Sequence, residues 1–310
     1  MLQIDVGQSV GYLRSLTGTD WMRPAEAAEA DRHSPTIEKG ATMVATSVAE
    51  KYVDLSHGKT RYLEAGSGHP VILLHGVGFT SAAENWEFNM APLGERFRVL
   101  APDFVGWGKG DRLDLEYSFA YLVDFIREFQ DALGIEHSHI VGHSMGGWVS
   151  GLFAYESPNR VDKLVLVSPG GLAPRTLHSM TNFKPPTKDE IKAQLEKRVR
   201  APGVNYDAMA DREMAKAQIP GAVEAYQRIL NHMNNSVTRN RYNTIRRLPK
   251  IKAPTLVIWG RQDSTNSFEE MGKGTAELIP NSKLVVVENC DHFIPTEKPE
   301  EFNKALLEFL

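Results

Sequence analysis

The stretch that decides the fold is His139-Ile-Val-Gly-His-Ser-Met-Gly-Gly147, in which an apolar run leads into a Gly-x-Ser-x-Gly pattern at residues 142–146. A helix-compatible segment, residues 148–157, follows it directly. This arrangement is typical of a buried strand that turns sharply into a helix with a serine at the apex. Small residues two positions before and after the serine let strand and helix pack closely. We therefore predict that Ser144 stands at a strained turn with its hydroxyl held out of the sheet.

Outward from this stretch, strand and helix patterns alternate. The segments that read as strands are Lys51–Leu55, Thr60–Ala65, Val71–His75, Phe97–Pro102, His139–His143, Lys163–Val167, Thr255–Gly260 and Ser282–Val287. The helical patterns among them are Ser118–Leu133, Ser144–Ser157, Glu269–Leu278 and Pro299–Leu310. Continuous apolar runs of this length are expected of strands buried on both faces. The alternation predicts an α/β fold with a mostly parallel, eight-stranded sheet flanked by helices.

One long interval, residues 170–249, has no convincing buried strand. Its helical pieces are Lys188–Arg200, Tyr206–Gln218 and Gly221–Leu248. We interpret it as a helical cap, inserted after the sixth strand over the carboxyl edge of the sheet, where ligands bind in open α/β folds. The predicted core is then residues 49–169 with 250–310, and the cap is 170–249.

Residues 1–48 lack strong periodicity, and we interpret them as an N-terminal extension that is partly helical around Pro24–Asp31. Two interpretations stay open. The extension covers another surface or a second subunit of a homo-oligomer, or it is a disordered tail.

Composition excludes several classes of partner. The chain has 310 residues, 42% of them hydrophobic, which is enough to bury a large core. A net charge of −4 argues against a nucleic-acid partner. The single cysteine, Cys290, excludes an internal disulfide and suits a reducing compartment. The N-terminus reads as no signal peptide, and the apolar runs are too short to span a bilayer. We expect a cytoplasmic protein that acts on a small molecule and binds no membrane.

The candidate nucleophile needs a base, and the base needs a third group to orient it. The base candidate is His292, because it follows the last predicted strand and so lies at the same sheet edge as Ser144. The acid candidate is Asp263, just past the strand that ends at Gly260. Asp291 is the rival, but a side chain adjacent in sequence to His292 normally points elsewhere. The predicted triad is Ser144, His292 and Asp263.

An oxyanion intermediate needs backbone N–H donors. The N–H of Met145, directly after the nucleophile, is one candidate. The loop after Val71–His75 should supply the other, with Val77 as first choice and Gly78 as second. We interpret His75 as a residue that braces this loop.

From about Lys51 to Leu310, the chain resembles an α/β-hydrolase with a helical cap. The motifs that carry the resemblance are His75-Gly-Val-Gly78, Asp103-Phe-Val-Gly-Trp-Gly108, Gly142-His-Ser-Met-Gly-Gly147, Gly260-Arg-Gln-Asp263 and Asp291-His292-Phe293. Serine at the apex disfavours the haloalkane dehalogenase and epoxide hydrolase relatives, which use aspartate there. We expect no cofactor and no metal, because no Cys/His cluster has zinc spacing and no Gly-rich loop matches a P-loop or a dinucleotide fingerprint.

Within that superfamily, residues 84–89, 101–103 and 161–166 resemble the hydrolases that cleave carbon–carbon bonds in meta-ring-fission products. In that group, a residue matching Asn85 contacts the substrate. The chain departs from the group twice: His143 replaces the usual Asn before the serine, and Phe293 replaces the usual Trp after the histidine. A histidine before the serine is commoner among ester and lactone hydrolases.

Three functions follow in order of preference. The first is hydrolysis of a carboxylic ester or lactone of a small, largely apolar substrate. The second is carbon–carbon hydrolysis of 2-hydroxy-6-oxo-dienoates. The third is a small-molecule receptor on a hydrolase scaffold.

Other side chains have competing interpretations. Asn85, Phe293 and Trp148 are the candidate substrate contacts, although Trp148 more often belongs to a core and Phe293 divides evenly between pocket and packing. Asp103 is interpreted as a loop brace and Cys290 as a buried, inert thiol. The cap arginines form a solvated helix face, or one of them clamps a substrate carboxylate; the candidates are Arg228, Arg239, Arg241, Arg246 and Arg247.

Overall fold

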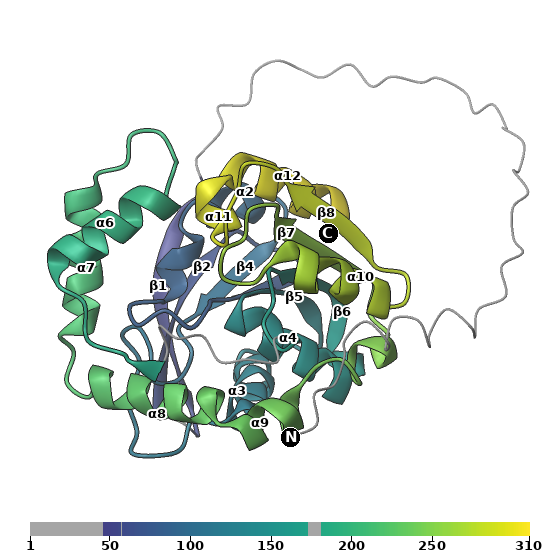
Figure 1. Cartoon of the computed structure of the whole chain (residues 1–310), viewed down its shortest axis with the longest axis horizontal. Helices are drawn as coiled ribbons and strands as arrows, with labels where there is room; N and C mark the ends of the chain where they lie inside the picture. Colours follow the sequence, from purple (N-terminus) through teal and green to yellow (C-terminus); the bar gives the residue numbers. More distant parts are fainter. Residues whose placement is uncertain (1–45, 57, 173–180) are drawn as a thin grey trace, which may run out of the picture. The chain divides into compact units, whose positions relative to one another are not determined.

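Short apolar strands form the centre of this computed structural model, which describes residues 46–56, 58–172 and 181–310 (Figure 1). The strands are β1 (Val48–Leu55), β2 (Gly58–Ala65), β3 (Pro70–Leu74), β4 (Arg98–Pro102), β5 (Ser138–His143), β6 (Val161–Val167), β7 (Thr255–Gly260) and β8 (Lys283–Val287). They form one eight-stranded sheet in the order β1-β2-β4-β3-β5-β6-β7-β8. The pairs β1–β2 and β2–β4 are antiparallel, and every other pair is parallel. The predicted α/β fold with a mostly parallel sheet is confirmed.

Helices cover both faces of the sheet. They are α2 (Met90–Gly94), α3 (Phe119–Ala132), α4 (Met145–Glu156), α10 (Lys273–Leu278), α11 (Ile294–Glu297) and α12 (Pro299–Phe309), with short turns η1 (Ala83–Trp86), η2 (Pro158–Arg160) and η4 (Phe268–Gly272). Strand β3 sends Ile72 and Leu74 into the core that includes α3 and α4. The same strand sends Val71 and Leu73 into the core that includes α2 and α12. A strand that fills two cores must be apolar throughout, which explains why its sequence pattern was legible.

Between β6 and β7, the described residues from 181 onward are mainly helical, and the prediction that this segment caps the sheet stays a prediction. Its elements are α6 (Lys188–Arg198), α7 (Tyr206–Ala217), α8 (Ala222–Asn234), α9 (Ser236–Tyr242) and η3 (Leu248–Lys250). The prediction of one long helix over Gly221–Leu248 is wrong. The chain turns at Asn235, which has an extended ψ of 125° and accepts a hydrogen bond from the Thr238 N–H. Asparagine is a strong N-cap residue because its side chain satisfies an N–H at the start of a helix. Asn235 therefore separates α8 from α9.

Strands β3, β5, β6, β7 and β8 run parallel, so their carboxyl ends meet at one edge of the sheet. Core and cap segments belong to one compact unit, residues 45–310. Residues 1–45 of the predicted extension, with its helix around Pro24–Asp31, lie outside the described residues, and Val48, which we placed in the extension, is the first residue of β1. Among the described residues, no helix combines the length and apolar character that crossing a membrane requires.

Candidate active site

Ser144 lies in the sharp turn between β5 and α4, as predicted. Its backbone has φ 55° and ψ −114°, a region that non-glycine residues rarely adopt and that costs about 1–3 kcal/mol. Its N–H donates to the carbonyl of Val167 at 2.9 Å, which ties the turn to strand β6. Between Ser138 and Ala154, Ser144 is the only residue that is not buried. The turn thus leaves Ser144 partly accessible, whereas the strand and the helix on either side of it are buried.

Two glycines make this turn sterically feasible. A Cβ atom on Gly142 would lie 2.3 Å from the Ser150 Oγ, and one on Gly146 would lie 2.2 Å from the carbonyl oxygen of Leu74. Atoms cannot approach so closely without a backbone shift. The small residues therefore allow α4 to lie directly against β5 and β3.

His292 and Asp263 lie together at the same edge of the sheet. His292 Nδ1 and Asp263 Oδ2 are 2.8 Å apart, and both side chains are buried. Because an ionised carboxylate only accepts hydrogen bonds, Nδ1 carries the proton and Nε2 is left to accept one. The other oxygen, Asp263 Oδ1, accepts from the N–H groups of Thr265 and Asn266 at 2.9 and 2.7 Å.

These contacts keep Asp263 ionised. Burial alone would raise the pKa of Asp263, but the hydrogen bonds from His292 and from the Asn266 N–H outweigh it and hold the pKa below its usual range. The rival acid, Asp291, instead accepts from the N–H and hydroxyl of Ser264. The structure thus pairs the imidazole with Asp263 and not with its sequence neighbour.

The His292 ring lies beside the serine turn. Its centroid is 4.8 Å from that of His143, the residue before Ser144. Among the described residues, no hydrogen bond joins Ser144 Oγ to His292. Bonds between a nucleophile and its base are often long without substrate and tighten only in the complex.

Glu297 is a residue of this site that sequence reasoning missed. Its Oε2 accepts from the Asp291 N–H and its Oε1 from the Phe293 N–H, both at 3.0 Å. One carboxylate therefore fixes the backbone on both sides of His292. Glu297 is only 3% exposed. An acidic residue in the first turn of a helix that starts directly after His292 was the signal available in the sequence.

The loop after β3 lies against the nucleophile. A Cβ atom on Gly76 would lie 3.2 Å from the Ser144 Cβ, so Val77 and Gly78 follow a direct point of contact with the serine. Met145 is the first residue of α4, and its N–H has no acceptor within the helix. These positions suit the predicted oxyanion donors, whose role stays a prediction.

His75 braces this loop, as predicted. Its Nδ1 donates to the Gly76 carbonyl at 2.8 Å, and its Nε2 accepts from the Phe104 N–H at 3.0 Å. That pattern requires one proton on the ring. Burial lowers the pKa of His75 to about 4, in agreement with a neutral imidazole at pH 7.

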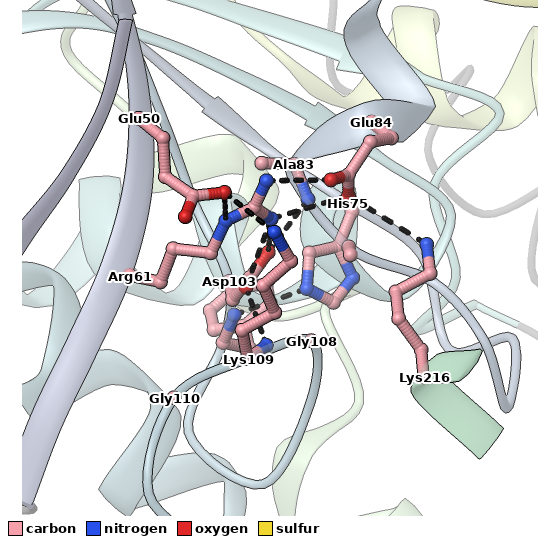
Figure 2. A network of polar contacts seen from close by, with 12 residues as sticks. Glu50, Arg61, His75, Ala83, Glu84, Asp103, Gly108, Lys109, Gly110 and Lys216 are labelled. Carbon is pink, nitrogen blue, oxygen red and sulfur yellow. Dashed lines mark hydrogen bonds and ion pairs between the residues drawn. The ribbon is translucent and has the colours of Figure 1, made fainter. Parts of the chain in front are cut away.

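Asp103 is also a loop brace, at the centre of the network in Figure 2. It accepts from the N–H groups of Ala83 and Lys109 at 2.8 and 2.9 Å. It also pairs with the buried Arg61 at 3.2 Å. Arg61 in turn pairs with Glu84 at 2.5 Å. This ion pair fixes η1, the segment that follows the loop after β3.

Two candidate substrate contacts are partly engaged with the protein itself. Asn85 Oδ1 accepts from the Ala82 N–H at 2.8 Å, so only its amide NH₂ remains for a ligand. Trp148 is 3% exposed, its Nε1 donates to the Tyr242 carbonyl at 2.8 Å, and its ring lies 4.2 Å from that of Phe119. These contacts fit the packing role that the sequence favoured for Trp148.

The third candidate substrate contact, Phe293, lies between His143 and Arg198. Its ring is 5.6 Å from that of His143, and the guanidinium carbon of Arg198 lies 5.1 Å from its centroid. His143 Nε2 donates to the His292 carbonyl at 2.8 Å. The two departures from the family pattern, His143 and Phe293, therefore contact each other and His292.

Arg198 is the second residue that the sequence analysis missed. Among the described residues, its guanidinium makes no hydrogen bond or ion pair. By contrast, Arg228 pairs with Asp114 at 2.5 Å, and Arg239 donates to the Met233 carbonyl. Burial lowers the pKa of Arg198, and the negative charge of Glu213 offsets this effect only in part. A guanidinium in this position is suited to an anion.

Comparison with known proteins gives one family. Residues 69–299 match the family model described as alpha/beta hydrolase fold. The 2-hydroxy-6-oxo-6-phenylhexa-2,4-dienoate hydrolase of Comamonas testosteroni is 31% identical over 294 residues, which cover 88% of this chain and 98% of that protein.

Solved structures give the same picture. A meta-cleavage product hydrolase from Pseudomonas fluorescens IP01 aligns with a TM-score of 0.72 and 28% identity over 84% of this chain and 96% of that one. An N-acyl homoserine lactone degrading enzyme, Est816, aligns with a TM-score of 0.69 and 26% identity over 84% of this chain and 100% of that one.

Proposed function

This chain belongs to the α/β-hydrolase fold family and is a hydrolase, and we propose that it cleaves a carbon–carbon bond in 2-hydroxy-6-oxo-dienoates. The observation that carries the proposal is the likeness to a dienoate hydrolase over almost the whole length of both chains. The sequence analysis placed ester or lactone hydrolysis first, because of His143 and Phe293, and carbon–carbon hydrolysis second. That likeness reverses this order. Both residues are buried or partly buried beside His292, where they support the base rather than require an ester substrate.

In the proposed mechanism, His292 Nε2 takes the Ser144 proton as Oγ attacks the ketone carbon at position 6. Asp263 stabilises the imidazolium that forms, and the N–H groups of Met145 and Val77 donate to the oxyanion. The substrate reacts as its keto tautomer, which has a 2-oxo group, a double bond between carbons 3 and 4 and a CH₂ at carbon 5. When the oxyanion collapses, the bond between carbons 5 and 6 breaks, its electron pair is delocalised onto the 2-oxo group as a dienolate, and the imidazolium of His292 gives its proton to that dienolate. Water, deprotonated by His292, releases the acyl group as a carboxylic acid and returns the proton to Ser144.

Arg198 supports the proposal because a dienoate substrate carries a carboxylate that a neutral ester lacks. The guanidinium lies over Phe293, next to the catalytic histidine. A charge-assisted hydrogen bond of this kind contributes about 1.5–3 kcal/mol. We assign Arg198, at the end of α6, to the substrate carboxylate, in place of the five cap arginines that the sequence offered.

Hydrolysis of an ester or lactone is the second candidate function. It is favoured by the histidine before Ser144 and by the likeness to a lactone-degrading enzyme. The same serine, histidine and aspartate would serve it. A receptor role has less support, because the relatives with matching names are hydrolases.

The first experiment compares steady-state kcat/KM for two substrates in one preparation. One is 2-hydroxy-6-oxo-6-phenylhexa-2,4-dienoate, and the other is a short-chain p-nitrophenyl ester. We expect the dienoate to be the better substrate, and Ser144→Ala to lower its turnover by roughly 10³-fold or more. Efficient ester cleavage with an inert dienoate would reject the carbon–carbon proposal.

A second experiment tests the role of Arg198. We expect Arg198→Met to raise KM for the dienoate by about 10–100-fold, the equivalent of 1.5–3 kcal/mol, and to leave the neutral ester unaffected. Arg228→Met is the matched control, because it removes the same charge from a cap residue that pairs with Asp114. Equal losses on both substrates in Arg198→Met would indicate a structural role instead.

A further inference from the structure

Three histidines and an aspartate gather at the sheet edge opposite Ser144. His69 precedes β3, His137 and His139 flank the start of β5, and Asp162 lies at the start of β6. These strands are neighbours in the sheet, so their amino-terminal ends lie side by side. At about 3.3 Å per residue, the length of β5 places this group roughly 16 Å from Ser144. The group is therefore separate from the site described above.

The side chains of this group lie close together. Asp162 Oδ2 lies 2.9 Å from His69 Nε2 and 2.7 Å from His137 Nδ1. The rings of His69 and His139 are 4.4 Å apart at their centroids. One donor atom from each of His69, His139 and Asp162 falls within a span of 4.8 Å. Donor atoms around a tetrahedral zinc ion are about 3.3 Å apart, so small side-chain rotations would suffice.

His139 supplies an independent observation. The residue is 7% exposed, and its Nδ1 is buried with no hydrogen-bond partner among the described residues. Buried polar atoms normally have a partner, because an unpaired one costs free energy. Burial, followed by the neighbouring His69, lowers the pKa of His139 to about 4.

We propose that His69, His139 and Asp162 form a binding site for Zn²⁺ that links the amino-terminal ends of β3, β5 and β6. Two imidazoles and one carboxylate are a donor set that zinc accepts, whereas Mg²⁺ and Ca²⁺ prefer oxygen donors alone. His69 is 37% and Asp162 is 32% exposed in their side chains, so an ion can enter from solvent and keep water as its fourth ligand.

His137 is the neighbour that competes with the ion. It donates to the same Asp162 oxygen, and that hydrogen bond raises the pKa of His137. Binding of the ion displaces this contact or recruits the His137 ring as the fourth ligand. The other charges near the group are Lys163 and Glu136, which act on the histidines at longer range.

The spacing of these residues explains why the sequence did not reveal the site. Zinc motifs are recognised by pairs of ligands a few residues apart. Here the donors lie at or just before the starts of three separate strands, at positions 69, 139 and 162, and only the sheet order brings them together.

The experiment uses the full chain with no histidine tag, titrated with ZnCl₂ in metal-free buffer by calorimetry. We expect one ion per chain, with affinity lowered by more than about 10-fold in His69→Ala and in Asp162→Asn, since loss of even an outer-shell partner costs 10–100-fold. Glu136→Gln is the matched control. This change removes an exposed carboxylate next to His137 and leaves the three donor residues intact. The affinity of the variant for zinc should therefore match that of the wild type.

Two further readouts separate a built site from adventitious binding. Zinc should raise the Tm of the wild type and leave that of His69→Ala unchanged, because only a ligand of the folded state stabilises it. Substitution with Co²⁺ should give the intense visible bands of a tetrahedral site in the wild type alone. Wild type that binds no zinc, or a His69→Ala variant with wild-type affinity and thermal shift, would overturn the proposal.

Discussion

At the residue scale, His143 holds the backbone of His292 through its imidazole ring. It occupies the position before the nucleophile, where the carbon–carbon hydrolases usually have asparagine. Its ring is 4% exposed, and its Nε2–H donates to the His292 carbonyl. Burial, followed by repulsion from His292, lowers the pKa of His143 to about 3. His143 is therefore a neutral positioning residue for the base at physiological pH.

This lowered pKa predicts a loss of stability in acid. The unfolded state binds a proton on His143 below about pH 6.5, and the folded state excludes it down to about pH 3. The free energy of unfolding should thus fall by up to about 1.4 kcal/mol per pH unit as the pH drops through that window. His143→Asn can still donate to the His292 carbonyl but cannot titrate. It should flatten the pH dependence of urea unfolding between about pH 6 and 4.

The control is His137→Asn. His137 is 50% exposed in its side chain, and its pKa is raised by Asp162, so its contribution is small and has the opposite sign. Equal slopes for the wild type and His143→Asn would mean that His143 is already protonated or solvated in the folded state.

At the scale of the element, the β5–α4 turn depends on contacts that leave no room for a methyl group. Gly142 faces the carbonyl of Gly146, with only 2.4 Å between that oxygen and the position of a Cβ atom. Gly147 is similarly close to Pro169. The strain at Ser144 persists because β5 packs into both cores and α4 packs into the core that includes α3.

Gly142→Ala should therefore lower the free energy of unfolding by about 1–3 kcal/mol or more, as an overpacked core does. Gly274→Ala, in α10, is the matched control, because nothing lies within 4 Å of its Cβ position. That change should be neutral or stabilise by up to about 1 kcal/mol. Chemical denaturation of both variants checks this, and similar losses in the two would contradict the packing argument.

At the scale of the whole molecule, ion pairs join the cap helices to the core near the oxyanion loop. Lys216 of α7 lies 3.6 Å from Glu84, and Arg212 of the same helix lies 2.8 Å from Glu87 (Figure 2 shows the first pair). Burial alone would raise the pKa of Glu84, but Lys216 and Arg61 lower it to about 2. Burial is the larger effect at Glu87 and raises its pKa.

These two glutamates should respond differently to the same substitution. Glu84→Gln should lower the free energy of unfolding by about 3 kcal/mol at pH 7, because it removes the buried carboxylate that Lys216 and Arg61 share and, among the described residues, leaves them only Glu213 and Asp103 as buried counter-charges. The contribution of Glu84 is present above about pH 4.5 and is lost as the pH falls toward 2. Glu87→Gln should cost less than about 1 kcal/mol. Urea unfolding at pH 7 distinguishes them, and equal costs would contradict the assigned roles.

Much of the architecture was determined by the sequence alone. Strands buried on both faces must be apolar throughout, and the apolar residues of the surrounding helices recur with the helical period. The alternation of strands and helices could therefore be predicted from Val71–Leu74 onward. The serine turn was legible for a similar reason, since Gly142 and Gly146 are required by local sterics. Because parallel strands end at one edge, Asp263 and His292 could also be placed with Ser144.

Tertiary structure decided what depends on side-chain direction and on contacts between distant segments. Arg198 and the His69–His139–Asp162 group carry no local pattern, because each acquires its environment from elements far away in the chain. The break at Asn235 escaped the periodic pattern because a single capping contact outweighs helix propensity there. Periodicity reports which face of an element is buried, whereas the partner of a charge is set only when the chain has folded.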